Sequence, residues 1–222
     1  MQAPKRDSRR CPTRRARPGR AGARVAAVAA AVLALAGCVP EAGSGGPTRQ
    51  KVTVAGRAVT IAAPAGLCID PASTRVDAAG AFVLMRDCAA GAGAGPPRTV
   101  LTASVSSGGL TGEGDAAADS LSELGDYIAT PDGLALVGRS GRSDRVRVLS
   151  RQLTRGVLFV LVEDRGPQPI AGLDRTFWRA FLEVNDRMTV LSALGFGGGL
   201  GPERELAELA ALASAIRGAN GA

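Results

Sequence analysis

Val157-Leu158-Phe159-Val160-Leu161-Val162 is a run of six apolar residues that lies between Gly156 and Glu163. A strand that is apolar on both faces must be covered on both sides. Residues 177–184 are nearly as apolar, and short turn-like segments join both runs to their neighbours. Such connections favour antiparallel pairing. The pattern therefore predicts an α+β fold, an antiparallel sheet with helices on both faces (an α/β/α sandwich).

The other elements follow from hydrophobic period and turn residues. Helices are expected from Asp115 to about Ile128, where Pro131 blocks continuation, and from Pro202 to Arg217. Further strands are expected within 51–62, as a hairpin that turns at 55–57, and at 82–86, 100–105, 145–153 and 188–194. The order of strands and helices resembles the Mog1/PsbP-like fold, a likeness of topology that implies no function.

The first 37 residues are typical of an export signal. They hold nine basic residues and one acid, and the apolar run Val25–Ala36 that follows the basic part is shorter than a membrane span. The sequence Leu35-Ala36-Gly37-Cys38 resembles a bacterial lipoprotein signal. The resemblance implies that Cys38 is lipidated and carries acyl chains such as palmitate. An ordinary signal peptide that contains a cysteine is the alternative.

Three regions are expected on this basis: a signal peptide at 1–37, a flexible Pro, Gly and Ser-rich tether at 38–50, and a single domain at 51–222. The chain would then be a periplasm-facing lipoprotein of the cell envelope, bound to the membrane through Cys38. Val39 follows the anchor in place of aspartate, which by resemblance to enteric sorting rules favours the outer over the inner membrane.

The charge of the chain is concentrated in the expected signal. The whole chain has 27 basic and 20 acidic residues, and 18 and 19 of these remain after residue 37. The sequence pI of 10.2 is therefore no sign of nucleic-acid binding, and no nucleic-acid partner is expected. The local basic run from Arg139 to Arg147 is interpreted as a solvated loop that enters a strand, with a weak anion contact as the alternative.

The cysteine pattern fits an oxidising compartment. Besides Cys38 and a cysteine in the expected signal, Cys68 and Cys88 remain, and an exported chain most often joins such a pair in a disulfide. Two separate buried thiols are the alternative. The sequence has no histidine, so it offers no zinc ligand set and no usual catalytic triad, and no metal or cofactor is expected.

The chain also resembles a family of small alphaproteobacterial lipoproteins with no established activity. The resemblance covers nearly all of the expected domain and rests on four stretches: Gly66–Pro71, Gly80–Leu84 with Asp87-Cys88, Leu161–Gly172 and Phe177–Val184. Members are sometimes labelled cation-transport ATPases. Neither a phosphorylation motif nor a phosphate-binding loop of that class occurs in this sequence, so the label implies no activity here.

One polar segment is a candidate functional site. Between two expected strands lie Glu163, Asp164, Arg165, Gln168, Asp174 and Arg175. They are expected to form ion pairs that stiffen a surface loop. The preferred hypothesis is a non-enzymatic binding or assembly module that meets an envelope protein partner through this loop. The alternative is an envelope hydrolase that uses its carboxylates, which requires two converging acids, one with a raised pKa.

Overall fold

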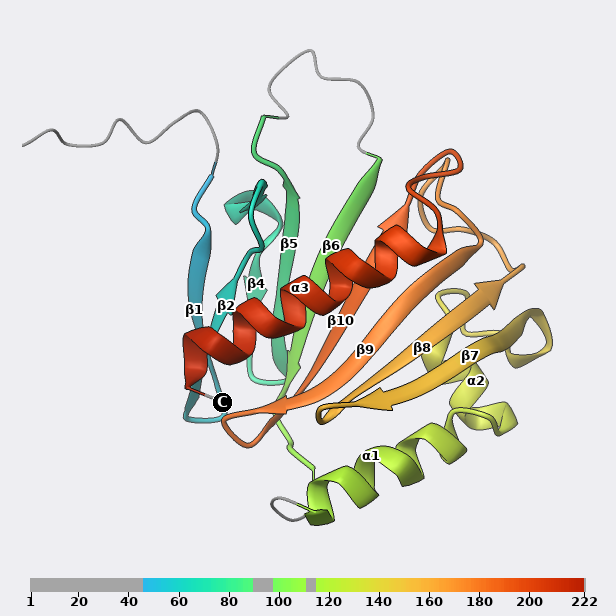
Figure 1. Ribbon diagram of the computed structural model, residues 1–222, viewed down its shortest axis with the longest axis horizontal. Helices are drawn as coiled ribbons and strands as arrows, with labels where there is room; N and C mark the ends of the chain where they lie inside the picture. The colour runs from blue at the N-terminus through green and yellow to red at the C-terminus, as the bar shows by residue number, and fades with distance from the viewer. Residues whose placement is uncertain (1–45, 90–97, 111–114, 222) are drawn as a thin grey trace, which may run out of the picture. The chain divides into compact units, whose positions relative to one another are not determined.

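The computed structural model describes residues 46–89, 98–110 and 115–221, which form a mixed α+β unit (Figure 1). Its strands are β1 (Arg49–Val54), β2 (Arg57–Ala62), β3 (Leu67–Ile69), β4 (Arg75–Val76), β5 (Gly80–Asp87), β6 (Thr99–Ser106), β7 (Val146–Thr154), β8 (Val157–Asp164), β9 (Thr176–Val184) and β10 (Arg187–Gly195). Its helices are α1 (Asp115–Tyr127), α2 (Pro131–Val137) and α3 (Pro202–Asn220), with 3₁₀ turns η1 (Pro71–Ser73) and η2 (Ser143–Arg145).

The main sheet has eight antiparallel strands. Seven follow the order β3-β5-β6-β10-β9-β8-β7, and β4 pairs with β5 beside β3. Helix α3 crosses one face of this sheet, packing on β9 and β10, whereas α1 and α2 lie at the β7–β8 end (Figure 1). The prediction of a largely antiparallel α+β fold is confirmed.

Alternating side chains divide the core between the two faces of the sheet. On β9, Trp178 and Leu182 pack with α3, and Phe177 and Phe181 pack with α1 and α2. Residues of β8 divide in the same way, which explains why both strands are apolar on both faces. The expected buried stripe of α3 is also found, at Leu209, Leu212, Ala213 and Ile216.

Three hairpins have the same two-residue turn. Both central residues have positive φ in Ala55-Gly56, Arg155-Gly156 and Asn185-Asp186. This is the pattern of the type I′ turn, whose twist matches that of the flanking strands. The hairpin predicted at 55–57 is therefore confirmed, with a turn one residue shorter than expected, and the short connections beside 157–162 and 177–184 are turns of the same kind.

Four features differ from the sequence-based prediction. Pro131 does not merely end a helix: it begins α2, because Thr130 caps the new helix by accepting a hydrogen bond from the Gly133 N–H, 3.2 Å. The short strands β3 and β4 were not predicted. The hairpin of β1 and β2 forms a sheet of its own, against α3 and β5. Its first strand begins at Arg49, inside the segment predicted as tether.

Other sequence-based expectations fall outside the described residues. These are the signal peptide 1–37, the lipidation site Cys38 and the tether up to residue 45. Within the described ranges, none of the helices combines the length and apolar character needed to cross a bilayer.

Candidate interaction loop and the side chains around it

Asp164 fixes the start of the candidate loop. This last residue of β8 has no exposed surface, and its carboxylate accepts four hydrogen bonds: from the backbone N–H groups of Arg139, Ser140 and Gly166, each 2.8 Å, and from the Ser140 hydroxyl, 2.9 Å. Burial opposes its ionisation, but these donors lower the pKa of Asp164 below its usual value. The ionised side chain thus joins the loop to the segment that follows α2.

The other residues predicted for this loop bond mostly to the backbone and not, as expected, to one another in ion pairs. Glu163 and Arg165 form an ion pair of 3.0 Å. The Gln168 amide donates to the carbonyl oxygens of Asp164 and Gly166, 3.0 Å each, and the Arg175 carbonyl accepts from the Asp164 N–H, 2.8 Å. The loop is therefore stiffened mainly by bonds to the backbone, and Glu163–Arg165 is the ion pair seen among its described residues.

The far end of the loop is tied to the glycine-rich segment between β10 and α3. Asp174 donates its N–H to the Gly195 carbonyl, 2.9 Å, and accepts from the Gly198 N–H, 2.8 Å. The Gly172 carbonyl accepts from the Gly197 N–H, 2.9 Å. Both ends are thus held, and the tip between them exposes Ile170, a large apolar side chain with 57% of its surface accessible.

Asp174 also faces a carboxyl group that sequence analysis did not single out. Its Oδ2 and the Oε1 of Glu205 lie 2.5 and 2.4 Å from the position that a Cβ on Gly195 would occupy, so the two oxygens are at most about 5 Å apart. The absence of a side chain at Gly195 makes room for both. Burial first, then the charges of Asp174 and Glu208, raise the pKa of Glu205 to about 7.

Glu205 was missed because its sequence position has an ordinary explanation. An acid in the first turn of a helix is stabilised by the helix dipole and usually remains exposed. Here the side chain is buried, and the residues that enclose it come from segments distant in the chain. The pair satisfies one requirement of the hydrolase hypothesis, two converging acids of which one has a raised pKa.

A second polar group lies on the sheet face that α1 and α2 cover only in part. In one row across three strands, Thr102 of β6 is opposite Ser192 of β10, which is opposite Arg179 of β9. Thr102 and Ser192 are buried. They line a cavity of about 320 Å³ together with Phe82, Val190 and Leu194.

Two arginines meet at this cavity. The guanidinium of Arg139 lies over the Phe177 ring, 4.2 Å from its centre, and that of Arg179 lies 5.6 Å from the same centre. Arg139 donates one bond to the Asp174 carbonyl, but its Nε and Nη1 and the Nε of Arg179 are buried without a hydrogen-bond partner. Burial, with the adjacent charge of Arg139, lowers the pKa of Arg179 to about 10, so the group stays charged at neutral pH.

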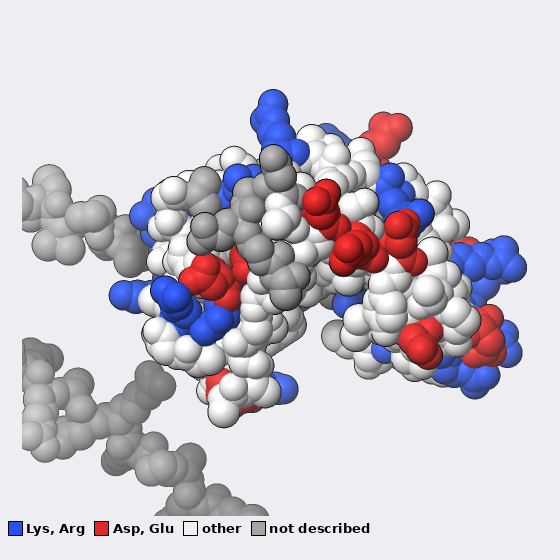
Figure 2. Space-filling view, turned by 90° about the horizontal axis from the view of Figure 1, so that it is seen from below, with Lys and Arg blue, Asp and Glu red and all other residues white. Residues whose placement is uncertain are grey.

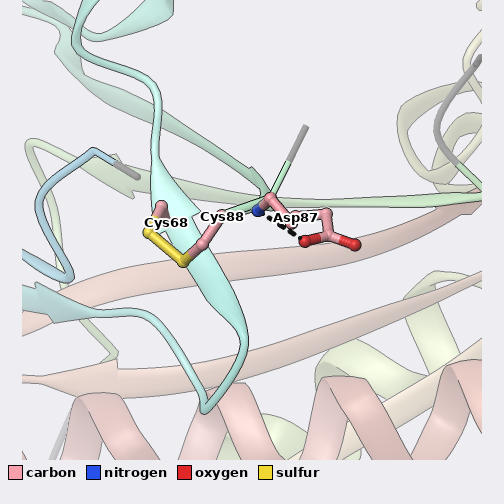
Figure 3. The surroundings of a disulfide bond; sticks show 4 residues. Cys68, Asp87 and Cys88 are labelled. Carbon is pink, nitrogen blue, oxygen red and sulfur yellow. Dashed lines mark hydrogen bonds between the residues drawn. A yellow bond between two sulfur atoms is a disulfide. The ribbon is translucent and has the colours of Figure 1, made fainter. Parts of the chain in front are cut away.

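Cys68 and Cys88 are joined in a disulfide, as predicted (Figure 3). The bond ties β3 to the end of β5, and the Cys88 N–H also donates to the Gly66 carbonyl, 3.0 Å. Next to it, the Asp87 carboxylate accepts from the Ala89 N–H, 2.8 Å (Figure 3). The disulfide thus secures the edge of the sheet.

The described residues offer little else that points to chemistry. They contain no cluster of three or more histidine, cysteine or acidic side chains that could hold a metal. A cavity of about 580 Å³ between α3 and the β7–β8 turn has Arg155 and Arg217 as its charged residues. The face in Figure 2 intersperses basic and acidic side chains, as expected of a nearly neutral domain.

Comparison with known proteins adds no relative. No protein-family model, curated protein or solved structure matches this chain.

Proposed function

We propose that the chain is a lipoprotein of the bacterial cell envelope that acts as a binding or assembly module. In this proposal Cys38 carries the lipid anchor, residues 38–50 link it to the folded unit, and the loop from Glu163 to Arg175 meets an envelope protein. The module faces the periplasm, with the outer membrane favoured over the inner. Helices on both sheet faces support a Mog1/PsbP-like arrangement for the folded unit.

The observation that carries this proposal is a loop held at both ends that exposes an apolar side chain at its tip. Asp164 holds the first end with four bonds, and Asp174 ties the second to the segment after β10. A loop that is ordered before binding loses less conformational entropy when a partner docks. Ile170, with the exposed Arg165 and Arg175, supplies the apolar centre and the polar rim of a small contact.

Affinity capture from bacterial membranes tests the loop. The full chain and its Ile170→Ser, Arg175→Ser double variant are compared, with Leu149→Ser as matched control because Leu149 is exposed to a similar degree, 51%, on β7. We expect one envelope protein to be retained by the chain and the control but lost by the loop variant. Identical sets of captured proteins for all three would exclude the loop as the site that binds a partner protein. Asp164 is left unchanged, since its loss would disturb the fold.

The anchor is tested separately by metabolic labelling with palmitate. A Cys38→Ser variant is expected to lose both the label and signal cleavage, while the folded unit keeps its circular dichroism spectrum. Signal cleavage that persists unchanged in this variant would contradict the lipoprotein assignment.

A carboxylate-dependent envelope hydrolase is the second candidate, favoured by the Asp174–Glu205 pair. Its oxygens are close enough for two carboxyls that act on one bond, where separations of about 5–5.5 Å occur in retaining glycosidases. It ranks second because Glu205 is only 3% exposed and a substrate would have to reach it. Release of soluble fragments from cell-wall glycan that stops in both Asp174→Asn and Glu205→Gln would support it; release unaffected by either would exclude it.

A further inference from the structure

The cavity of about 320 Å³ is lined by two arginines, Arg139 and Arg179. Among the described residues, three of their guanidinium nitrogens are buried without an acceptor, two of Arg139 and one of Arg179. A buried donor without a partner is costly, more so when it belongs to a charged group, and native proteins seldom leave such groups unpaired. An oxyanion in this cavity would bring acceptor atoms next to the two guanidinium groups.

The row of polar residues extends this donor set. Ser192 is the direct cross-strand neighbour of Arg179, and Thr102 is that of Ser192. Both hydroxyls lie between a row that contains Phe82, Ser104 and Val190 and a row that contains Leu194. Buried polar groups at the centre of an apolar sheet face have no role in packing, but they suit a ligand that carries both an anionic head and an apolar body.

The apolar part of the cavity continues beyond the arginines. Phe82, Ser104 and Val190 line both this cavity and a second one of about 390 Å³, which reaches Arg75 and Asp77 near β4. The two spaces therefore follow one another along the sheet face. In the described part of the chain, α1 and α2 make their main sheet contacts with β7, β8 and β9, whereas most residues that line the two cavities belong to β5, β6 and β10.

The charges around the arginines favour a ligand with a single negative charge. Asp164 lies close enough to interact electrostatically with both Arg139 and Arg179, and Asp174 and Glu205 do so with Arg139. Three carboxyl groups thus lie near two guanidinium groups, so little positive charge is left to balance a ligand with more than one negative charge. A carboxylate would pair with the guanidinium groups through two oxygens, whereas a phosphate dianion would bring excess negative charge.

We propose that this cavity binds the carboxylate of a medium-chain aliphatic acid, with the head between Arg139 and Arg179 and the chain over Phe82 and Val190. The site is distinct from the loop assigned above to protein binding. Each can therefore fail without the other: loss of the protein partner leaves acid binding intact, and absence of acid binding leaves partner capture intact.

Calorimetric titration of the purified full chain tests the proposal with four probes. Octanoate is expected to bind with one molecule per chain, and acetate and 1-octanol at least about tenfold more weakly, since each lacks the chain or the charge. Failure of octanoate to bind would overturn the proposal, as would equally tight binding of acetate or of octanol. Tighter binding of octyl phosphate than of octanoate would overturn the choice of a carboxylate.

Two variants locate the site, and a third is the control. Arg179→Gln is expected to weaken octanoate binding at least about tenfold and to make it no tighter than that of octanol. Ser104→Leu should weaken octanoate binding by filling the cavity while both arginines remain, which keeps the test valid if the arginine variant does not fold. Arg147→Gln, an exposed arginine on β7, should change nothing. Binding that is unaffected by both cavity variants would place the acid elsewhere and contradict the proposal.

Discussion

At the scale of single residues, the molecule contains two buried carboxyl groups with opposite properties. Burial opposes ionisation at both, but N–H and O–H donors lower the pKa of Asp164, whereas the charges of Asp174 and Glu208 add to the effect of burial and raise the pKa of Glu205 to about 7. A buried ionised carboxyl group therefore stabilises the fold at Asp164 and destabilises it at Glu205.

Replacing Asp164 by asparagine is expected to destabilise the protein by about 2–3 kcal/mol. The amide nitrogen would face one of two groups of N–H donors, so at least one bond would be lost and a buried donor left without an acceptor. Urea denaturation at pH 7 measures the change. Asp119→Asn, at an exposed position of α1, is the matched control and should leave the midpoint unchanged. Equal stability of both variants would show that the Asp164 carboxylate contributes little.

The raised pKa of Glu205 leads us to expect that the stability of the protein falls as the pH rises. Its pKa in the folded state is about 7 and in the unfolded chain near the ordinary value of 4.5, so the folded state binds the extra proton between these values. The free energy of unfolding should therefore fall as pH rises from about 4.5 to 7, by on the order of 2 kcal/mol, and then level off. Glu205→Gln should remove this decline and be the more stable protein at pH 8.

Thermal or urea unfolding across pH 5–8 measures that difference. Glu203→Gln is the control, because Glu203 lies in the same first turn of α3 but is exposed. The control should keep the decline, and a decline that persists in Glu205→Gln would assign it to another group.

At the scale of elements, the sequence predicted most of the helices and hairpins whose formation depends on neighbouring residues alone. The hairpin of β9 and β10 was predictable because Asn185-Asp186 tolerates positive φ between two apolar runs. Helix α2 was missed because Pro131 both stops one helix and starts another, and only the Thr130 cap distinguishes the two outcomes. β4 has two exposed residues and no periodicity from which it could be recognised.

The arginine cavity and the Asp174–Glu205 pair were less predictable from the sequence than the helices and strands were. Arg139 and Arg179 come from segments 40 residues apart, and nothing local shows that both reach Phe177. Glu205 meets Asp174 only because Gly195 lacks a side chain between them. Such groups depend on the packing of distant segments, so residue types and spacing could indicate the loop around Asp174 but not its partners.

The edge element β3 is expected to depend on the disulfide. Joining Cys68 to Cys88 closes a loop of sequence separation 20, which stabilises the folded state by about 3 kcal/mol through the entropy of the unfolded chain. The Cys68→Ala, Cys88→Ala double variant should lose about that amount in urea denaturation. The rate of amide hydrogen exchange should rise most in β3 and at the end of β5. Exchange that rises equally throughout the sheet would contradict a local role for the bond.

At the scale of the whole molecule, the charge distribution means that the expected removal of residues 1–37 would change the isoelectric point. The full chain has 27 basic and 20 acidic residues and a sequence pI of 10.2. Removal of residues 1–37 would leave 18 basic and 19 acidic residues, and a lipidated amino terminus would add no positive charge. The chain has no histidine, and the raised pKa of Glu205, about 7, lets this acid take up a proton near neutral pH.

Isoelectric focusing of the protein from bacterial membranes should therefore find an isoelectric point below 7 if the chain is cleaved before Cys38. The Cys38→Ser variant, expected to remain uncleaved, should focus above pH 9 and so serves as the control. A wild-type band that stays above pH 9 would mean that the basic segment is retained. In that case the anchor proposed at Cys38 would be wrong, whereas the loop at Ile170 and the arginine cavity would remain open to their own tests.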